Sequence, residues 1–133
     1  MGELEVNGMK NKFRNITVGN TEYIYRYGWN DGLRIVISLK HNKHCRVELH
    51  FPAEEPKEEI QHFWRFYEIV LNQDAAQKIV KLVGPKFLSQ MIMHLEESTD
   101  IFHNSKNVCI QSAWYLLRQM GYADVQPNWI VEF

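Results

Sequence analysis

The chain has 133 residues, a net charge of −1 and a hydrophobic share of 45%. A chain of this length normally forms one domain and buries enough surface to fold without disulfides or bound metals. The balanced charge gives no argument for nucleic acid or an anionic membrane as partner, since both attract basic proteins. No apolar run has the length of a membrane span or a secretory signal, so we expect a cytoplasmic protein with two reduced cysteines.

An alternation of apolar and polar residues organises the first part of the chain. Residues 1–11 are polar and lack any period, so we expect a flexible tail followed by a single domain over residues 12–133. From Tyr23 to Phe51 every apolar side chain of the alternation carries an odd number. This period is typical of strands with one buried and one solvent-facing side. We expect four antiparallel strands, at residues 12–18, 22–29, 33–40 and 45–51.

The numbering of the alternation also predicts how these strands pair. Gly19 and Asn20 are a signal for a two-residue hairpin turn. A three-residue turn at residues 30–32 places Trp29 opposite Leu33 and keeps odd residues opposite odd ones, with its glycine in the left-handed position of a bulge. The tyrosines at 23, 25 and 27 then point to the buried side of the sheet.

After Pro52 the apolar period changes from 2 to 3.6, which predicts about four helices. Gly84 and Pro85 mark a helix stop and a helix start, and Gly121 marks the end of the last helix. The sequence therefore predicts an α+β protein: an N-terminal four-stranded antiparallel meander, about four C-terminal helices packed on one face, and a short C-terminal edge strand. The apolar stripes of the four helices lie within residues 60–71, 76–83, 87–95 and 109–120.

The first predicted helix is the candidate for a partner surface. Phe66 and Ile69 widen its apolar arc beyond the stripe that carries Trp64 and Tyr67. A helix that is apolar nearly all round is either buried on every side or contacts a partner, and aromatic side chains are frequent anchors of such contacts. Burial is the commoner outcome. The arc nevertheless leads us to expect a small interaction protein without evident catalysis, of inhibitor or immunity type or forming a homodimer.

The alternative is a small-ligand-binding protein or an enzyme with its site between the sheet and the helices. Buried tyrosine hydroxyls need hydrogen-bond partners, so a row of them can line a polar pocket. The residues expected to line it are Tyr23, Tyr25, Tyr27, His62 and His94.

A metal site near the third predicted turn is the less favoured interpretation of its residues. His41, His44 and Cys45 lie close together in the sequence. A structural zinc site needs four ligands, however, and Cys45 falls on the buried side of its strand. We therefore expect no metal and no cofactor.

Other reactive residues also favour a structural interpretation. Cys109 follows a helix start and has His94 and His103 as conceivable bases, but it shares an apolar stripe and is expected to be a small core residue. Glu96 and Glu97 lie near a predicted helix end and are interpreted as solvated surface.

The solvent-facing side of the meander carries four cations and one anion. Arg34 and Glu48 lie diagonally on adjacent strands and are expected to form an ion pair. Proteins that read nucleic acid on a sheet need aromatic rings on the exposed side, and the rings of these strands point to the other side. We therefore expect no nucleic-acid partner. The charged residues concerned are Arg26, Arg34, Lys40, Arg46 and Glu48.

Overall fold

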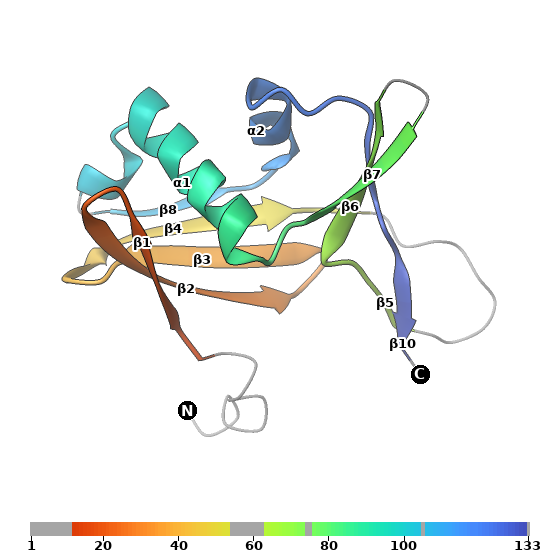
Figure 1. The fold of residues 1–133 in the computed structure, drawn as a ribbon. Helices are drawn as coiled ribbons and strands as arrows, with labels where there is room; N and C mark the ends of the chain where they lie inside the picture. Colours follow the sequence, from red (N-terminus) through yellow and green to blue (C-terminus); the bar gives the residue numbers. More distant parts are fainter. Residues whose placement is uncertain (1–11, 54–62, 74–75, 105, 133) are drawn as a thin grey trace.

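A five-stranded sheet with two α-helices on one side forms the larger part of the molecule (Figure 1). The computed structural model describes residues 12–53, 63–73, 76–104 and 106–132. The tail predicted at residues 1–11 lies outside the described residues. Two small sheets lie beside one end of the large sheet (Figure 1).

The large sheet combines the predicted meander with one strand from the C-terminal part of the chain. Its order is β1-β2-β3-β4-β8, and β8 (Asn107–Ile110) runs parallel to β4. The other neighbours are antiparallel. The four meander strands are β1 (Arg14–Val18), β2 (Thr21–Trp29), β3 (Leu33–Leu39) and β4 (Asn42–Phe51).

The pairing predicted from odd and even numbering is confirmed for β2 and β3. Trp29 lies opposite Leu33 and Tyr23 lies opposite Leu39. The turn between them places both Asp31 (φ 56°) and Gly32 (φ 123°) at positive φ. The pairing of β3 with β4 also joins odd with odd until a bulge between Ser38 and Leu39 shifts it. The turn after β3 is therefore tighter than predicted.

Helix α1 (Pro85–Ser98) covers the odd side of the sheet (Figure 1). Gly84 is its N-cap and Pro85 opens its first turn, as the sequence predicts. Its buried side chains are those of the predicted stripe and join the strands in one core. These side chains are Phe87, Leu88, Met91, Ile92 and Leu95.

The prediction of about four helices packed on the meander is wrong. The described residues contain only two α-helices, α1 and α2 (Trp114–Gln119), together with a short 3₁₀ turn, η2 (Ile101–His103). Residues 107–110, expected in a helix, form β8.

The described residues of the segment expected to form the first two helices contain no helix and form three strands with short links. β5 (Phe63–Arg65) pairs with β10 (Ile130–Glu132), so the C-terminal strand exists but lies in a separate small sheet. β6 (Glu68–Gln73) lies between β7 (Ala76–Lys81) and β9 (Val125–Pro127). The start expected at Pro56 lies outside the described residues.

The physical reason for this error is the composition of the segment. Ile69 and Leu71 are buried and alternate with more exposed neighbours, which is the period of a strand. Aromatic and β-branched residues favour strands, and this preference outweighs the i, i+3, i+4 spacing that suggested a helix.

An aromatic cluster joins the small sheets to the large one, with Phe66 at its centre. The fully buried Phe66 ring stacks on Trp114 of α2 at 5.7 Å between centroids. It meets Trp29 of β2 edge-on at 5.0 Å and Trp129 at 5.2 Å. Each pair of this kind adds to the stabilisation from burial, so Phe66 couples three parts of the chain.

Neither helix of the described chain has the length and apolar character that crossing a bilayer requires.

Replacing Gly32 by alanine should destabilise the protein by about 2 kcal/mol or more, because two costs combine. The residue has φ 123°, and an added Cβ would lie 2.3 Å from the Phe51 carbonyl oxygen. Gly19→Ala is the matched control, since it also has positive φ but open space around its Cβ position. Urea unfolding that gave equal losses for both variants would contradict the steric part of this argument.

Phe66→Ala should lower the free energy of unfolding by about 3–5 kcal/mol, the usual cost of removing a buried ring. Tyr115→Ala, at a half-exposed aromatic of α2, should cost much less. Both losses follow from denaturant titration. A Phe66 variant as stable as the Tyr115 control would show that the cluster does not couple the sheets.

Candidate functional site

The structure does not assemble the residues of the predicted partner surface on one exposed face. Phe66 and Ile69 are buried. Tyr67 is half-buried and meets Tyr27 edge-on at 6.3 Å. Trp64 belongs to β5.

The residues expected to line a pocket are also dispersed. Tyr25 is a core residue, and His94 Nε2 lies 2.8 Å from Gln119 Oε1, where it links α1 to α2. His62 lies outside the described residues. Of the described members, Tyr23 borders a cavity.

That cavity, which we call the acidic hollow, lies between the β1–β2 turn and the C-terminal half of α1. Its volume is about 370 Å³. It is lined by Val18, Gly19, Asn20, Thr21, Tyr23, Met93, Glu96, Glu97 and His103.

A hydrogen-bonded row of three side chains forms one wall of the acidic hollow. The Tyr23 hydroxyl donates to Glu96 Oε2, and His103 Nε2 lies 2.8 Å from Glu96 Oε1. Tyr23 is held by burial, with 1% of its surface exposed, and by an edge contact with Phe102 of η2. Both oxygens of the Glu96 carboxylate are thus fixed by neighbours from β2 and η2.

The electrostatics of the acidic hollow are negative. Glu96 and Glu97 lie in the last turn of α1, which contains no basic residue. The carboxyl end of a helix carries a partial negative charge, so acids there are unfavourable and cations are favoured. The lining contains no lysine or arginine, and its basic side chain, His103, forms an ion pair with Glu96 when it is protonated.

Tyr23 is suited to donate a hydrogen bond and not to accept a proton. Burial, followed by the neighbouring Glu96 carboxylate, raises the pKa of the Tyr23 phenol well above its ordinary value. The phenol therefore keeps its proton at physiological pH, which leaves it unable to act there as a base or nucleophile.

Sequence analysis missed Glu96 and His103 as partners of Tyr23. Glu96 was expected on the solvated surface, yet it is only partly exposed. One signal was present: Glu96 follows Ile92 by four residues and therefore borders the buried stripe of α1. Nothing in the sequence places His103 beside it.

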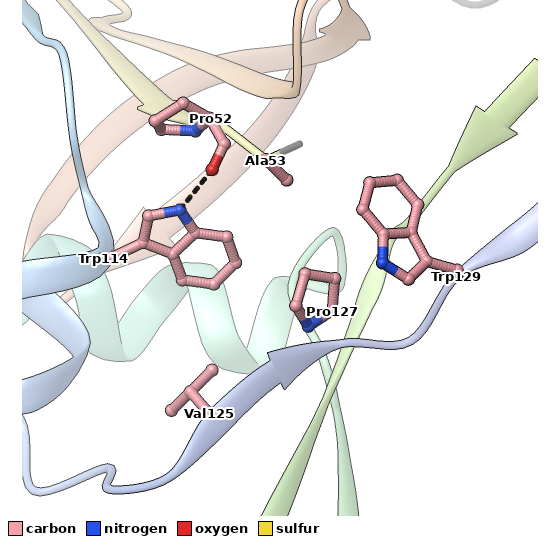
Figure 2. A pocket seen from close by; sticks show the side chains of 6 residues that line it. All are labelled: Pro52, Ala53, Trp114, Val125, Pro127 and Trp129. Atoms are coloured by element: carbon pink, nitrogen blue, oxygen red, sulfur yellow. Dashed lines mark hydrogen bonds between the residues drawn. The ribbon is translucent and has the colours of Figure 1, made fainter. Parts of the chain in front are cut away.

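A second cavity, of about 360 Å³, opens beside α2 and is shown in Figure 2. Trp114 Nε1 donates to the Pro52 carbonyl oxygen at 2.6 Å, so this indole is anchored (Figure 2). Trp114 and Trp129 both belong to the aromatic cluster around Phe66. We therefore assign this cleft a structural role at the joint between the sheets. Its lining comprises Pro52, Ala53, Trp114, Val125, Pro127 and Trp129.

The other reactive residues that the structure describes form no comparable site. Cys109 was expected to be a small core residue on a helix, but it is exposed and lies on β8. Its Sγ lies 3.8 Å from Glu48 Oε2, and desolvation, followed by this carboxylate, raises the pKa of its thiol. A raised pKa lowers the share of thiolate, which is the nucleophilic form. Cys45 is buried. Within the described ranges, no three His, Cys, Asp or Glu residues are grouped so that they could hold a metal ion.

Comparison with known proteins found no match, whether against models of protein families, curated proteins or solved structures.

The raised pKa of Tyr23 predicts a loss of stability at alkaline pH. An unfolded tyrosine releases its proton near about pH 10, whereas the folded protein holds it to higher pH. Above that pH the folded state binds more protons than the unfolded state. The contribution of Tyr23 is therefore complete below about pH 10 and is lost as the pH rises through the folded-state pKa.

Urea unfolding at about pH 8 and about pH 11 measures this contribution, because the ordinary tyrosine pKa lies between the two. Tyr23→Phe should remove part of the pH dependence that the unchanged protein shows. Equal pH dependence in both proteins would contradict the assignment.

Proposed function

We propose that the protein binds a small organic cation, such as an alkylammonium or guanidinium group, in the acidic hollow. The observation that carries this proposal is the Glu96 carboxylate, fixed by Tyr23 and His103 at the negatively charged end of α1.

Charge complementarity supports a cationic ligand. Glu96 and Glu97 lie together with the C-terminal end of a helix and without a basic residue in that turn. Bringing a cation to this position relieves repulsion between the carboxylates and the helix carbonyl groups.

The shape and lining of the hollow support a ligand with a short apolar part. A volume of about 370 Å³ is near the lower end for small-molecule sites, which are commonly about 300–1,000 Å³. Val18 and Met93 provide apolar surface beside the carboxylates, and Thr21 and Asn20 add polar groups at the turn.

Binding is better supported than catalysis. The Tyr23 hydroxyl donates to Glu96, and its raised pKa disfavours release of that proton. His103 has its Nε2 engaged by the same carboxylate. The row therefore orients a negative charge, which is the requirement for holding a cation.

The structure removes the observation that favoured binding of another protein as the function. It depended on an apolar arc around a helix at residues 60–71, whereas the described part of that segment forms β5, β6 and the link between them, with Phe66 and Ile69 buried. The ligand-binding alternative retains Tyr23 in a real cavity.

Calorimetry with butylamine, butylguanidinium and neutral butanol tests the proposal. We expect the two cations to bind and butanol not to bind measurably. Glu96→Gln removes the charge but keeps the shape, and should weaken cation binding by about tenfold or more, as loss of a charge-assisted contact does.

Glu22→Gln is the matched control, because Glu22 lies beside the β1–β2 turn but is engaged by Lys40 and His41. It should change the affinity by less than about twofold, since charges separated by solvent are screened. Absence of cation binding to the unchanged protein, or equal binding to Glu96→Gln, would refute the proposal.

A further inference from the structure

The side of the five-stranded sheet that faces away from α1 and α2 is bare of other elements in the described chain (Figure 1). It carries the even-numbered residues of β2, β3 and β4. Most of these side chains are partly exposed, which fits a face that contacts solvent.

An aromatic ring that sequence analysis did not place lies on this face. Arg14 pairs with Tyr25, so the preceding residue, Phe13, lies beside Arg26. The Cζ atoms of Arg26 and Arg46 lie 5.0 Å and 5.9 Å from the Phe13 ring centroid. We call Phe13, Arg26 and Arg46 the arginine cluster. Phe13 is 38% exposed, so the cluster is accessible.

The arginine cluster carries charge that the described chain does not neutralise. Arg34, on the same face, is paired with Glu48, as the sequence predicts. Within the described residues, Arg26 and Arg46 have no acidic partner. One ring thus lies beside two like charges, and an anion between them would relieve their mutual repulsion.

Arg46 gives a second and independent sign of a missing partner. Its Nε–H is buried and meets no hydrogen-bond acceptor among the described residues. A buried donor without an acceptor is costly, and more so when it is charged, so native structures rarely keep one. An oxygen acceptor beside Arg46 would satisfy this Nε–H donor.

We propose that the arginine cluster binds the oxyanion of a small organic ligand, a phosphate or a carboxylate. Guanidinium groups match both oxyanions through paired N–H donors, and two of them fit one doubly charged group. The bound oxyanion would neutralise both guanidinium groups, and a turn of the Arg46 side chain would bring its buried Nε–H to the oxyanion. This site is on the opposite side of the sheet from the acidic hollow and does not depend on it.

The surroundings of the cluster indicate an organic ligand in preference to an inorganic ion. Val36 lies directly opposite Arg26, and Ile24 precedes Arg26 on the same face of β2. Both are partly exposed. An aryl or alkyl group attached to the oxyanion would cover these side chains, adding apolar burial to the charge interaction.

NMR titration of the full chain tests the proposal with phenyl phosphate, benzoate, inorganic phosphate and neutral benzyl alcohol. We expect phenyl phosphate or benzoate to bind, inorganic phosphate to bind more weakly and benzyl alcohol not to bind. The tighter of the first two identifies whether phosphate or carboxylate is the preferred group. Shifts should centre on β2, β3 and β4.

Arg46→Met keeps an apolar stem and removes the donors, and it should weaken binding by at least about tenfold. Arg14→Met is the matched control, because Arg14 adjoins Phe13 but alternates to the other side of β1. It should leave the affinity within about twofold, as expected for a screened distant charge. Arg46→Lys, which keeps the charge without the Nε donor, gives the same test if Arg46→Met fails to fold.

Three results would overturn the proposal. The first is no binding of either organic oxyanion to the unchanged protein. The second is equal weakening by Arg14→Met and Arg46→Met, which would indicate net charge alone. The third is binding of a single-stranded oligonucleotide while phenyl phosphate and benzoate do not bind, which would assign the face to a polymer.

Discussion

The burial of Phe66 is the constraint on which the remainder of the fold depends. Its ring contacts Trp29 from the large sheet, Trp114 from α2 and Trp129 from the C-terminal segment. These parts are distant in sequence and belong to no common sheet. Dense ring packing tolerates little displacement, so fixing Phe66 fixes the small sheets beside the large one. The cleft beside Trp114 lies where the sheets meet around Phe66. The acidic hollow lies between the meander and α1, and the arginine cluster lies on the meander.

The sequence predicts an element correctly where the spacing of apolar residues fits only a strand, with a period of 2, or only a helix, with a period of 3.6. From Tyr23 to Phe51 the alternation predicts strands, and the register of β2 with β3 follows from the turn at residues 30–32. The stripe of α1 is equally clear because Gly84 and Pro85 mark its start. Residues 63–71 satisfy both periods, and long-range packing of Phe66 and Ile69 decides between them. Phe66 and Ile69 made the predicted helix apolar on nearly every side, and this excess of apolar residues already favoured strands.

The candidate sites were predictable to a smaller extent, because they depend on contacts between distant segments. The odd number of Tyr23 in the alternation places it on the buried side of the sheet. Its partner Glu96, however, is 73 residues away, and His103 lies in another element. The position of Phe13 could have been predicted from the sequence, because the two-residue turn after Val18 sets the register of β1 with β2 and so places Phe13 beside Arg26. The two sides of the sheet therefore differ in charge. Carboxylates lie at one end of the side covered by α1, and guanidinium groups lie on the uncovered side.

The parallel pairing of β8 with β4 has a consequence for biosynthesis. Strand β4 ends at Phe51, but its neighbour on that edge begins at Asn107, so the ribosome delivers the two far apart in time. Until then the backbone groups of β4 form an open edge, which is a template for pairing with another nascent chain. Such late, long-range pairing also slows folding. Strand β8 therefore covers the edge of a meander whose other pairings join neighbouring segments of the chain.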